Sequence, residues 1–404
     1  MTSLLPQSIT DAVVRRFERG VCFGQLDVTL PDGASRTLQG ADPGPHAALH
    51  LVHWRALWQL KLAGSVGWYR AWAAGDWHSG DPVALFAFFS ANRHSLSGKA
   101  RSRGPVRWLN RILHRRQRND RHGARRNVAA HYDLGNVFYA AWLDDTMSYS
   151  SALFDPKCDG ETLESAQRRK IEAILDRLNL SRGATLLEIG SGWGALAARA
   201  IERFGVAYTG ITLSAEQADW ARQTVGEGDA RFLLQDYRDA TGQYDAIASV
   251  EMVEAVGHEY WPDYLDAIAR LLRPGGRAAI QYIAIDDALF ADYAANADFI
   301  QTYIFPGGCL LSVRAFRALA EKRGLQWQDQ HDFPLDYAKT LQMWRARYDA
   351  ARADGRLPAA FDPDFDKLWR YYLMYCEGGF RGGGITVAQL TLVKADACAA
   401  SGSP

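Results

Sequence analysis

The feature that most constrains the fold is an alternation of short apolar runs with helical stretches, which begins at about residue 160. The apolar runs are ATLLEIG, AYTGITL, ARFLLQD, YDAIASV and GRAAIQYIAI, and the stretches between them include ALAARAIERF, AEQADWARQTV and YLDAIARLL. Strands of a parallel sheet are buried on both faces, so they form nearly continuous apolar runs joined by crossover helices. The sequence therefore predicts an α/β fold with a doubly wound, mostly parallel, Rossmann-like sheet.

Two further regions flank this pattern. Residues from about 286 to 378 are mostly helical in pattern and precede a last strand in GITVAQLTLVKA, which predicts a helical lid over the carboxyl ends of the strands, where such sheets bind ligands. Residues 1–98 contain CFGQLDVTLPDGASRTLQ, whose alternation and Pro-Asp-Gly turn predict a hairpin, followed by helical stretches broken by glycines. We expect them to form a smaller, mixed α+β N-terminal domain.

Residues 99–126 form a basic segment between this domain and residues 127–404. The segment has one acidic residue, Asp120, and its apolar residues gather around Trp108 and Ile112. An amphipathic helix with a cationic face can lie on an anionic membrane surface. A solvated linker helix is the alternative. We expect no nucleic-acid partner, because no aromatic platform or nucleic-acid motif accompanies the charge.

Composition and the absence of targeting signals bear on the partners and the cellular location of the protein. The 404 residues include 46 basic and 46 acidic ones, so the net charge indicates no class of partner. The five cysteines, Cys22, Cys158, Cys309, Cys376 and Cys398, show no CxxC spacing, which predicts reduced thiols and no metal site. The sequence shows neither a signal peptide nor a spanning run of about 18 apolar residues. With the basic segment, these features predict a cytoplasmic protein, peripheral on the inner face of the cell membrane. The oligomeric state stays open, with a homodimer as one option.

A glycine-rich turn follows the first apolar run of the sheet. In LLEIGSGWGAL, Gly190, Gly192 and Gly194 separate a strand from a helix, so the backbone can turn tightly and approach a ligand closely. The E-x-G-x-G-x-G spacing lacks the last interval of the dinucleotide pattern, which favours S-adenosylmethionine. Asp236 closes the third strand as an acceptor for adenine, and Tyr237 beside it could pack on the ring.

Two carboxylates follow the fourth apolar run, in SVEMVEAVGHEYW. Glu251 and Glu254 stand three residues apart at the end of a strand that is otherwise apolar. Glu254 either faces a developing positive charge or caps the helix that begins near Pro262, since acids favour helix N-termini. Glu251 either joins Glu254 around that charge or forms a salt bridge at the surface.

Seven motifs in order give the chain a family resemblance. They are HYDLGNVFYAAWLDDTMSYSSALF, LLEIGSGWGALA, GITLSAEQ, LLQDYRD, VEMVEAVGHEYWPDY, DFIQTYIFPGG and WRYYLMYCEGGFRGGGI, from about Asn127 to Lys394. Together they resemble the cyclopropane fatty acid synthase family. The resemblance implies a seven-stranded methyltransferase sheet and methyl transfer from S-adenosylmethionine to a cis double bond of a phospholipid acyl chain. It also implies a carbocation on the chain, which loses a proton to close a cyclopropane.

The resemblance implies the site residues as well. The cofactor contacts would be Tyr149, Ser150, Glu188, Gly190, Gly192, Trp193, Gly194, Thr212, Leu213, Ser214, Gln217, Asp236 and Tyr237. Glu254 and Tyr337 match the active-site Glu and Tyr of the family, and Ile283 matches an Ile that contributes through its backbone.

Two positions depart from the family pattern. Members that close the ring hold a bicarbonate as proton acceptor, and its ligands include a Cys and a His where this chain has Ser151 and Gln281. Glutamine can donate a hydrogen bond but cannot become a cation or relay a proton as histidine does. The departures put a bicarbonate site in doubt and leave two products open, a cyclopropane or a methyl-branched alkene. A separate reductase or desaturase could convert the alkene.

Two other functions stay open at this stage. The fold could instead methylate the nitrogen of a small amine, since relatives of this fold use a similar Glu-x-x-Glu loop for that reaction. A non-catalytic lipid-binding subunit is the other alternative, although the intact glycine turn speaks against it.

Overall fold

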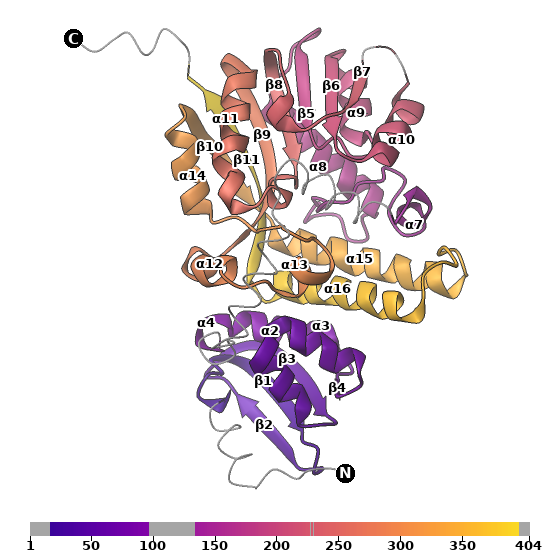
Figure 1. The fold of residues 1–404 in the computed structure, drawn as a ribbon, viewed down its shortest axis with the longest axis vertical. Helices are drawn as coiled ribbons and strands as arrows, with labels where there is room; N and C mark the ends of the chain where they lie inside the picture. Colours follow the sequence, from indigo (N-terminus) through magenta and orange to yellow (C-terminus); the bar gives the residue numbers. More distant parts are fainter. Residues whose placement is uncertain (1–16, 97–133, 227, 229, 396–404) are drawn as a thin grey trace, which may run out of the picture. The chain divides into compact units, whose positions relative to one another are not determined.

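The computed structural model of the protein describes residues 17–96, 134–226, 228 and 230–395. The chain divides into two compact units. The first comprises Met1–Arg116, Ala291–Ile304 and Ala359–Ile385, and the second comprises Gln117–Phe290, Phe305–Pro358 and Thr386–Pro404. Each unit contains one sheet, and Figure 1 shows the elements of both.

The first unit is built on a four-stranded sheet in the order β2-β1-β3-β4. Its strands are β1 (Phe23–Thr29), β2 (Ser35–Gln39), β3 (Asp42–Leu51) and β4 (Trp77–His78). The antiparallel pairing of β1 with β2 confirms the predicted hairpin. β3, which the sequence pattern did not predict, pairs with β1 in parallel.

Helices from three parts of the sequence belong to this unit. They are α2 (Arg55–Ala73), α3 (Pro82–Ala91), α4 (Arg93–Leu96), α13 (Phe299–Tyr303) and α16 (Pro363–Arg381). As the sequence predicts, a glycine interrupts the first of them, because Gly64 lies inside α2 with a non-helical φ of 58°. α16 packs against α3 so closely that a Cβ on Gly378 would lie 2.3 Å from the Cβ of Phe86.

The second unit is built on a seven-stranded sheet in the order β10-β11-β9-β8-β5-β6-β7. Its strands are β5 (Thr185–Ile189), β6 (Ala207–Thr212), β7 (Ala230–Leu234), β8 (Tyr244–Val250), β9 (Leu272–Ile285), β10 (Leu325–Asp332) and β11 (Ile385–Lys394). β5 pairs in parallel with β6 and β8, as do β6 with β7 and β8 with β9, whereas β10 and β11 are antiparallel. This architecture confirms the predicted fold class.

Helices cover both faces of this sheet (Figure 1). They include α8 (Leu163–Arg177), α9 (Ala195–Phe204), α10 (Ala215–Val225), α11 (Trp261–Leu271) and α14 (Val313–Glu321). The unit also contains α15 (Pro334–Ala353) and the shorter α7 (Asn136–Ala140), whereas α12 (Asp287–Ala294) is divided between the two units. Two apolar cores result: Leu187 packs in the core with α11 and α14, and its neighbour Leu186 packs in the core with α8 and α9. Alternate residues of a strand point to opposite faces, which explains the unbroken apolar runs.

The segment 286–378, expected as one mostly helical insertion, is more complex. It contains the strand β10, and its residues are divided between the two units. Six of the eight residues of β10, LQWQDQHD, are polar, so no apolar run marked this strand. β10 lies at the edge of the sheet, where a strand needs little apolar surface.

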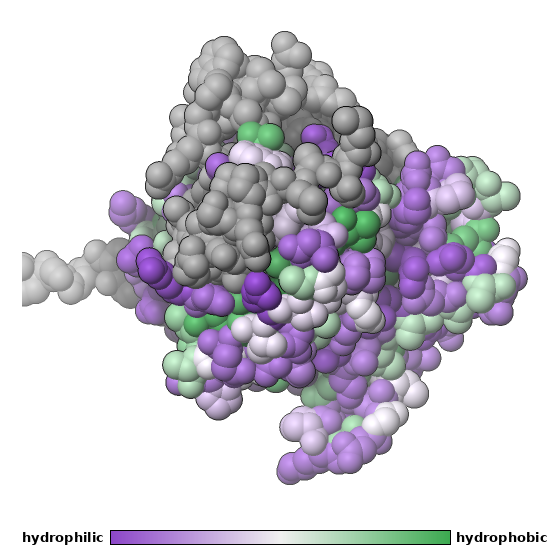
Figure 2. Space-filling model, turned by 90° about the horizontal axis from the view of Figure 1, so that it is seen from below, coloured by the Kyte–Doolittle hydropathy of each residue, from purple (hydrophilic) through white to green (hydrophobic). Residues whose placement is uncertain are grey.

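Some predictions concern residues that lie outside the described part of the chain. The basic segment 99–126 and Cys398 are among them. No described helix combines the length and the apolar composition needed to cross a bilayer. Hydrophilic residues predominate among the described residues on the face seen in Figure 2, with small hydrophobic areas between them.

Candidate functional site

The glycine turn between β5 and α9 has the backbone conformation that glycine allows. Gly190, Gly192 and Gly194 have φ angles of 85°, 50° and 93°, in the left-handed region that other residues rarely adopt. A Cβ on Gly190 would lie 2.8 Å from Cγ of Met252, and a Cβ on Gly194 would lie 3.1 Å from the Cβ of Ala221. The turn therefore needs glycine for backbone conformation at all three positions and for space at Gly190 and Gly194.

This turn forms one wall of a cavity of about 190 Å³ at the carboxyl ends of the strands. The predicted cofactor residues that line it are Tyr149, Ser150, Glu188, Gly190, Gly192, Trp193, Thr212, Leu213, Gln217, Asp236 and Tyr237. Gly194 and Ser214 lie outside the lining and act at helix starts: Gly194 is the N-cap of α9, and Ser214 accepts from the backbone of Gln217 at the start of α10.

Charged residues of both signs line the cavity. Asp236 accepts from Nε of Arg238 at 2.8 Å and pairs with its terminal nitrogen at 2.6 Å, so the expected adenine acceptor is already ion-paired. The Tyr237 hydroxyl is buried and has no hydrogen-bond partner among the described residues. Glu188, Asp236 and Glu251 supply three carboxylates. Carboxylates, an aromatic ring and glycine amides fit a nucleoside that carries a positively charged amino acid group, so the cavity suits S-adenosylmethionine.

A buried lysine opposite these carboxylates was not predicted. Lys170 of α8 lies in the cavity wall, and its Nζ donates to Oγ of Ser150 at 2.6 Å. Burial lowers the pKa of Lys170, and the nearby Glu251, Asp144 and Glu188 counter that effect. The helical pattern could have shown its position, because Lys170 lies four residues before Ile174 on the buried face of α8.

Glu188 lies at the end of β5, beneath the glycine turn. It accepts a hydrogen bond from the Tyr208 hydroxyl, and burial raises the pKa of Glu188 to about 7. The carboxyl group therefore gains or loses its proton close to neutral pH, and a positively charged ligand in the cavity would favour the ionised form.

The segment Tyr149–Ser151 is held from two sides. Gln167 of α8 donates to the carbonyl of Ser150 at 2.8 Å, and the backbone amide of Ala152 donates to Oγ1 of Thr340 in α15 at 3.1 Å. The ring of Tyr149 lies 5.3 Å from that of Trp344, also in α15. These contacts fix the backbone beside the cavity.

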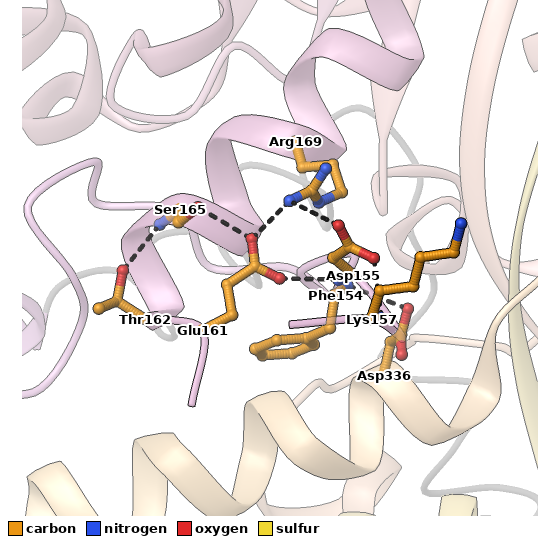
Figure 3. A network of polar contacts seen from close by, with 8 residues as sticks. All are labelled: Phe154, Asp155, Lys157, Glu161, Thr162, Ser165, Arg169 and Asp336. Carbon is orange, nitrogen blue, oxygen red and sulfur yellow. Dashed lines mark hydrogen bonds and ion pairs between the residues drawn. The ribbon is translucent and has the colours of Figure 1, made fainter. Parts of the chain in front are cut away.

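A polar network beyond this segment holds the following loop (Figure 3). Glu161 accepts from the amide of Asp155 at 2.7 Å, from Oγ of Ser165 at 2.8 Å and from Arg169 at 2.8 Å. Phe154 donates its amide to Asp336 of α15 at 3.2 Å. The network joins the loop to α8 and α15, the two helices that carry Lys170 and Tyr337.

Glu251 is the centre of the second polar cluster. Its Oε1 accepts from the amide of Ser151 at 2.8 Å and from Nε2 of Gln281 at 2.7 Å, and its Oε2 accepts from the Tyr337 hydroxyl at 2.7 Å. Burial raises the pKa of Glu251, and these hydrogen bonds oppose the rise. The alternative of a surface salt bridge is therefore wrong.

Gln281 is itself held in one orientation. Its Oε1 accepts from Nε2 of Gln389 in β11 at 3.0 Å, which leaves Nε2 to donate to Glu251 and to the carbonyl of Ser151, at 3.2 Å. Gln281 and Ser151 are both fully buried. A neutral amide fixed in this way donates at every ordinary pH.

Glu254 lies in a different environment from Glu251. Its Oε1 accepts from the amide of Ile283, whereas its Oε2 is buried without a hydrogen-bond partner among the described residues. Burial, and secondly the charge of Glu251, raise the pKa of Glu254 to about 8. The helix-cap alternative is wrong, because α11 begins at Trp261 and has no side-chain cap. Glu251, not Glu254, belongs to the cavity lining.

A substitution tests the role of the glycine turn. Gly190→Ala should lower the affinity for S-adenosylhomocysteine at least tenfold and destabilise the fold by about 1–3 kcal/mol, because the new methyl group meets Met252 in a strained backbone. Calorimetry and urea unfolding measure the two effects. Gly183→Ala, also at positive φ but with open space around its Cβ, is the matched control and should leave affinity unchanged. Equal affinity losses in both variants would contradict the close-approach argument.

Comparison with known proteins adds independent information. The family model described as mycolic acid cyclopropane synthetase matches residues 119–390. The chain is 39% identical over 345 residues to tuberculostearic acid methyltransferase UfaA1 of Mycobacterium tuberculosis, covering 82% of this chain and 79% of that protein. It is 37% identical over 265 residues to the cyclopropane-fatty-acyl-phospholipid synthase of Escherichia coli, covering 65% of this chain and 66% of that protein.

Solved structures agree with this assignment. The cyclopropane synthase MmaA2 from Mycobacterium tuberculosis superimposes with a TM-score of 0.62 at 31% identity, covering 67% of this chain and 98% of that one. The mycolic acid cyclopropane synthase CmaA1, complexed with SAH and CTAB, has the same TM-score of 0.62 at 33% identity, with 67% and 98% covered. The protein belongs to the mycolic acid cyclopropane synthetase family.

Proposed function

We propose that this enzyme methylates the double bond of an unsaturated acyl chain in a phospholipid, with S-adenosylmethionine as the methyl donor. The observation that carries the proposal is the pair Glu251 and Glu254 at the end of β8. Glu251 lies in the cavity wall, and Glu254 has a buried oxygen with no hydrogen-bond partner in the described part of the chain. A carboxylate in such a place stabilises positive charge that develops during a reaction.

The cavity residues would hold the cofactor by their chemistry. Tyr149 and Ser150 lie on one side with Lys170, the glycine turn supplies backbone amides, and Asp236 with Tyr237 lies at the end of β7. When bound, S-adenosylmethionine supplies an electrophilic methyl group on a positively charged sulfur. The residues of the cavity orient that group and exclude water from it.

Glu254 has the features of an electrostatic stabiliser. The Ile283 amide fixes one of its oxygens, and the other has no hydrogen bond to give up among the described residues. An alkene that attacks the methyl group acquires positive charge on its other carbon. The oriented carboxylate lowers the energy of that charge in a site with a low dielectric constant.

We propose a methyl-branched alkene as the product. Gln281 stands where ring-closing relatives are expected to have histidine, and its amide cannot relay a proton. The 39% identity to tuberculostearic acid methyltransferase supports the same product class. A reductase would then be the class of enzyme that consumes the alkene.

The basic segment 99–126 would bring the enzyme to its substrate at the inner face of the membrane. Neutralising Arg115, Arg116 and Arg118 together should weaken binding to anionic vesicles by about 100-fold at low salt, with a smaller effect at high salt, because exposed charges are screened. Vesicle co-sedimentation at two salt concentrations measures this. If the triple variant bound vesicles as well as the wild type does, segment 99–126 would not be the membrane-binding element.

Expression in a host rich in monounsaturated phospholipids tests the proposed function. The fatty esters are analysed by mass spectrometry before and after mild hydrogenation. A new ester one methylene heavier that takes up hydrogen is the proposed alkene, and one that resists is a cyclopropane. Absence of any heavier ester, with a methylated amine in its place, would overturn the proposal in favour of N-methylation.

A further inference from the structure

We infer that Glu251 is the group that accepts the proton lost after methyl transfer, so that the protein carries its own carboxylate where a bound small anion would otherwise be needed. The inference rests on the proposed function and deepens it. Three hydrogen-bond donors from separate elements converge on the Glu251 side chain.

These donors occupy sequence positions where the family resemblance implies an anion site. The amide of Ser151, the amide group of Gln281 and the hydroxyl of Tyr337 all point to one carboxylate, with donor–acceptor distances of 2.7–2.8 Å. A bound bicarbonate would need hydrogen-bond donors, and Glu251 already accepts from all three of these. A second anion beside this carboxylate would meet its negative charge.

The backbone of Glu251 shows that the side chain is held in place at some cost. Its φ is 49°, in the left-handed region that costs a residue with a Cβ about 1 kcal/mol or more. The Glu251 amide donates to the carbonyl of Gln281 at 2.8 Å, which ties this strained residue to β9. Glycine would adopt the same conformation freely, so the carboxylate explains why a larger residue stands here.

Charges around Glu251 keep a proton acceptor available. Lys170 of α8 attracts the ionised form, and Glu254 repels it. Gln281 of β9 and Tyr337 of α15 face the group as neutral donors. Glu251 also lines the cofactor cavity, so the residue borders the space in which the methyl donor would bind.

Methyl transfer followed by proton loss to Glu251 requires no further reactant. The alkene electron pair forms a carbon–carbon bond to the methyl group as the carbon–sulfur bond breaks, which leaves a carbocation on the acyl chain and a neutral thioether. A C–H bond adjacent to the cation then gives its electron pair to the new π bond, and its proton passes to Glu251. The carboxylic acid that results returns the proton to solvent after the product leaves.

Purified enzyme, S-adenosylmethionine and vesicles of monounsaturated phosphatidylglycerol test the assignment. Glu251→Gln should lower turnover at least about 100-fold at saturating S-adenosylmethionine, the range of general-base catalysis. Because Glu251 lines the cofactor cavity, calorimetry with S-adenosylhomocysteine measures any loss of cofactor affinity separately. Glu251→Gly, which suits the backbone, should be inactive and regain activity when bicarbonate or formate is added. Glu202→Gln, on the exposed face of α9, is the matched control.

The wild-type enzyme allows a second test of the assignment that needs no variant. Its turnover should be the same in buffer freed of bicarbonate and in buffer supplemented with it. Loss of wild-type turnover on bicarbonate removal, or turnover within threefold of wild type in folded Glu251→Gln, would overturn the assignment. A wild-type enzyme that methylates no acyl chain under any condition would instead refute the proposed function, so the two failures are distinct.

Discussion

Replacing Glu254 with glutamine is expected to lower turnover about 100- to 1000-fold, the loss typical of removing one electrostatic stabiliser of a transition state. The amide keeps the shape of the side chain but removes the negative charge that we propose stabilises the developing cation. Affinity for S-adenosylhomocysteine should change less than about threefold, because Glu254 is not part of the cofactor cavity lining. Methyl release from labelled cofactor and calorimetry measure the two quantities.

Glu259→Gln provides the control for this substitution, since Glu259 lies in the same loop and pairs with His258 at the surface. It should retain full turnover. Normal turnover in Glu254→Gln would remove the carboxylate from the mechanism, and a large loss of cofactor affinity would move Glu254 into the binding site.

The same variant should change how stability depends on pH. Burial raises the folded-state pKa of Glu254 from 4.5 to about 8, so between these values the unfolded chain releases a proton that the folded protein retains. This group therefore makes the cofactor-free protein less stable as pH rises from about 5 to about 8. Urea unfolding of Glu254→Gln should show a smaller loss of stability over that interval than the wild type does.

Replacing Lys170 with methionine should destabilise the protein by about 3–5 kcal/mol, as expected when one partner of a buried charge group is removed. Lys170 is fully buried, and Glu251, Asp144 and Glu188 are the carboxylates that raise its pKa against the effect of burial. Methionine has a similar length but leaves these groups without their cation and Ser150 without its donor. Affinity for S-adenosylhomocysteine should fall at least tenfold.

Lys157→Met is the control for Lys170→Met, because Lys157 is exposed in the neighbouring loop. Its free energy of unfolding, measured with urea, should lie within about 0.5 kcal/mol of that of the wild type. If Lys170→Met were as stable as this control and bound cofactor equally well, the buried cation would have no part in organising the cavity.

The apolar strands were the part of the fold that sequence could predict. The runs that became β5, β6, β8 and β9 are buried on both faces of the sheet, so their composition alone identifies them. β7 lies at the sheet edge opposite β10 with only Phe232 buried, but its apolar residues still marked it in the sequence. β10 escaped prediction because it lies at the sheet edge and its composition is polar. β3 was missed for a related reason, since only its last residues alternate between buried and exposed.

The cofactor cavity was largely predictable because a turn and three strand ends are local features of the sequence. The roles of the carboxylates were not. Glu251 and Glu254 are three residues apart, yet their hydrogen bonds come from Ser151, Gln281, Tyr337 and Ile283, which lie far away along the chain. The positive φ of Glu251, which sets the direction of its side chain, has no marker in the sequence.

The most direct test of the account uses purified protein, monounsaturated phosphatidylglycerol vesicles and S-adenosylmethionine that carries a deuterated methyl group. The acyl chains and the head groups are separated and analysed by mass spectrometry. The account predicts that the label appears in the acyl chain, on a carbon of the former double bond, in equal amount to the S-adenosylhomocysteine released. Label in an amine, or none in any acyl chain while S-adenosylhomocysteine still binds in the cavity, would contradict it.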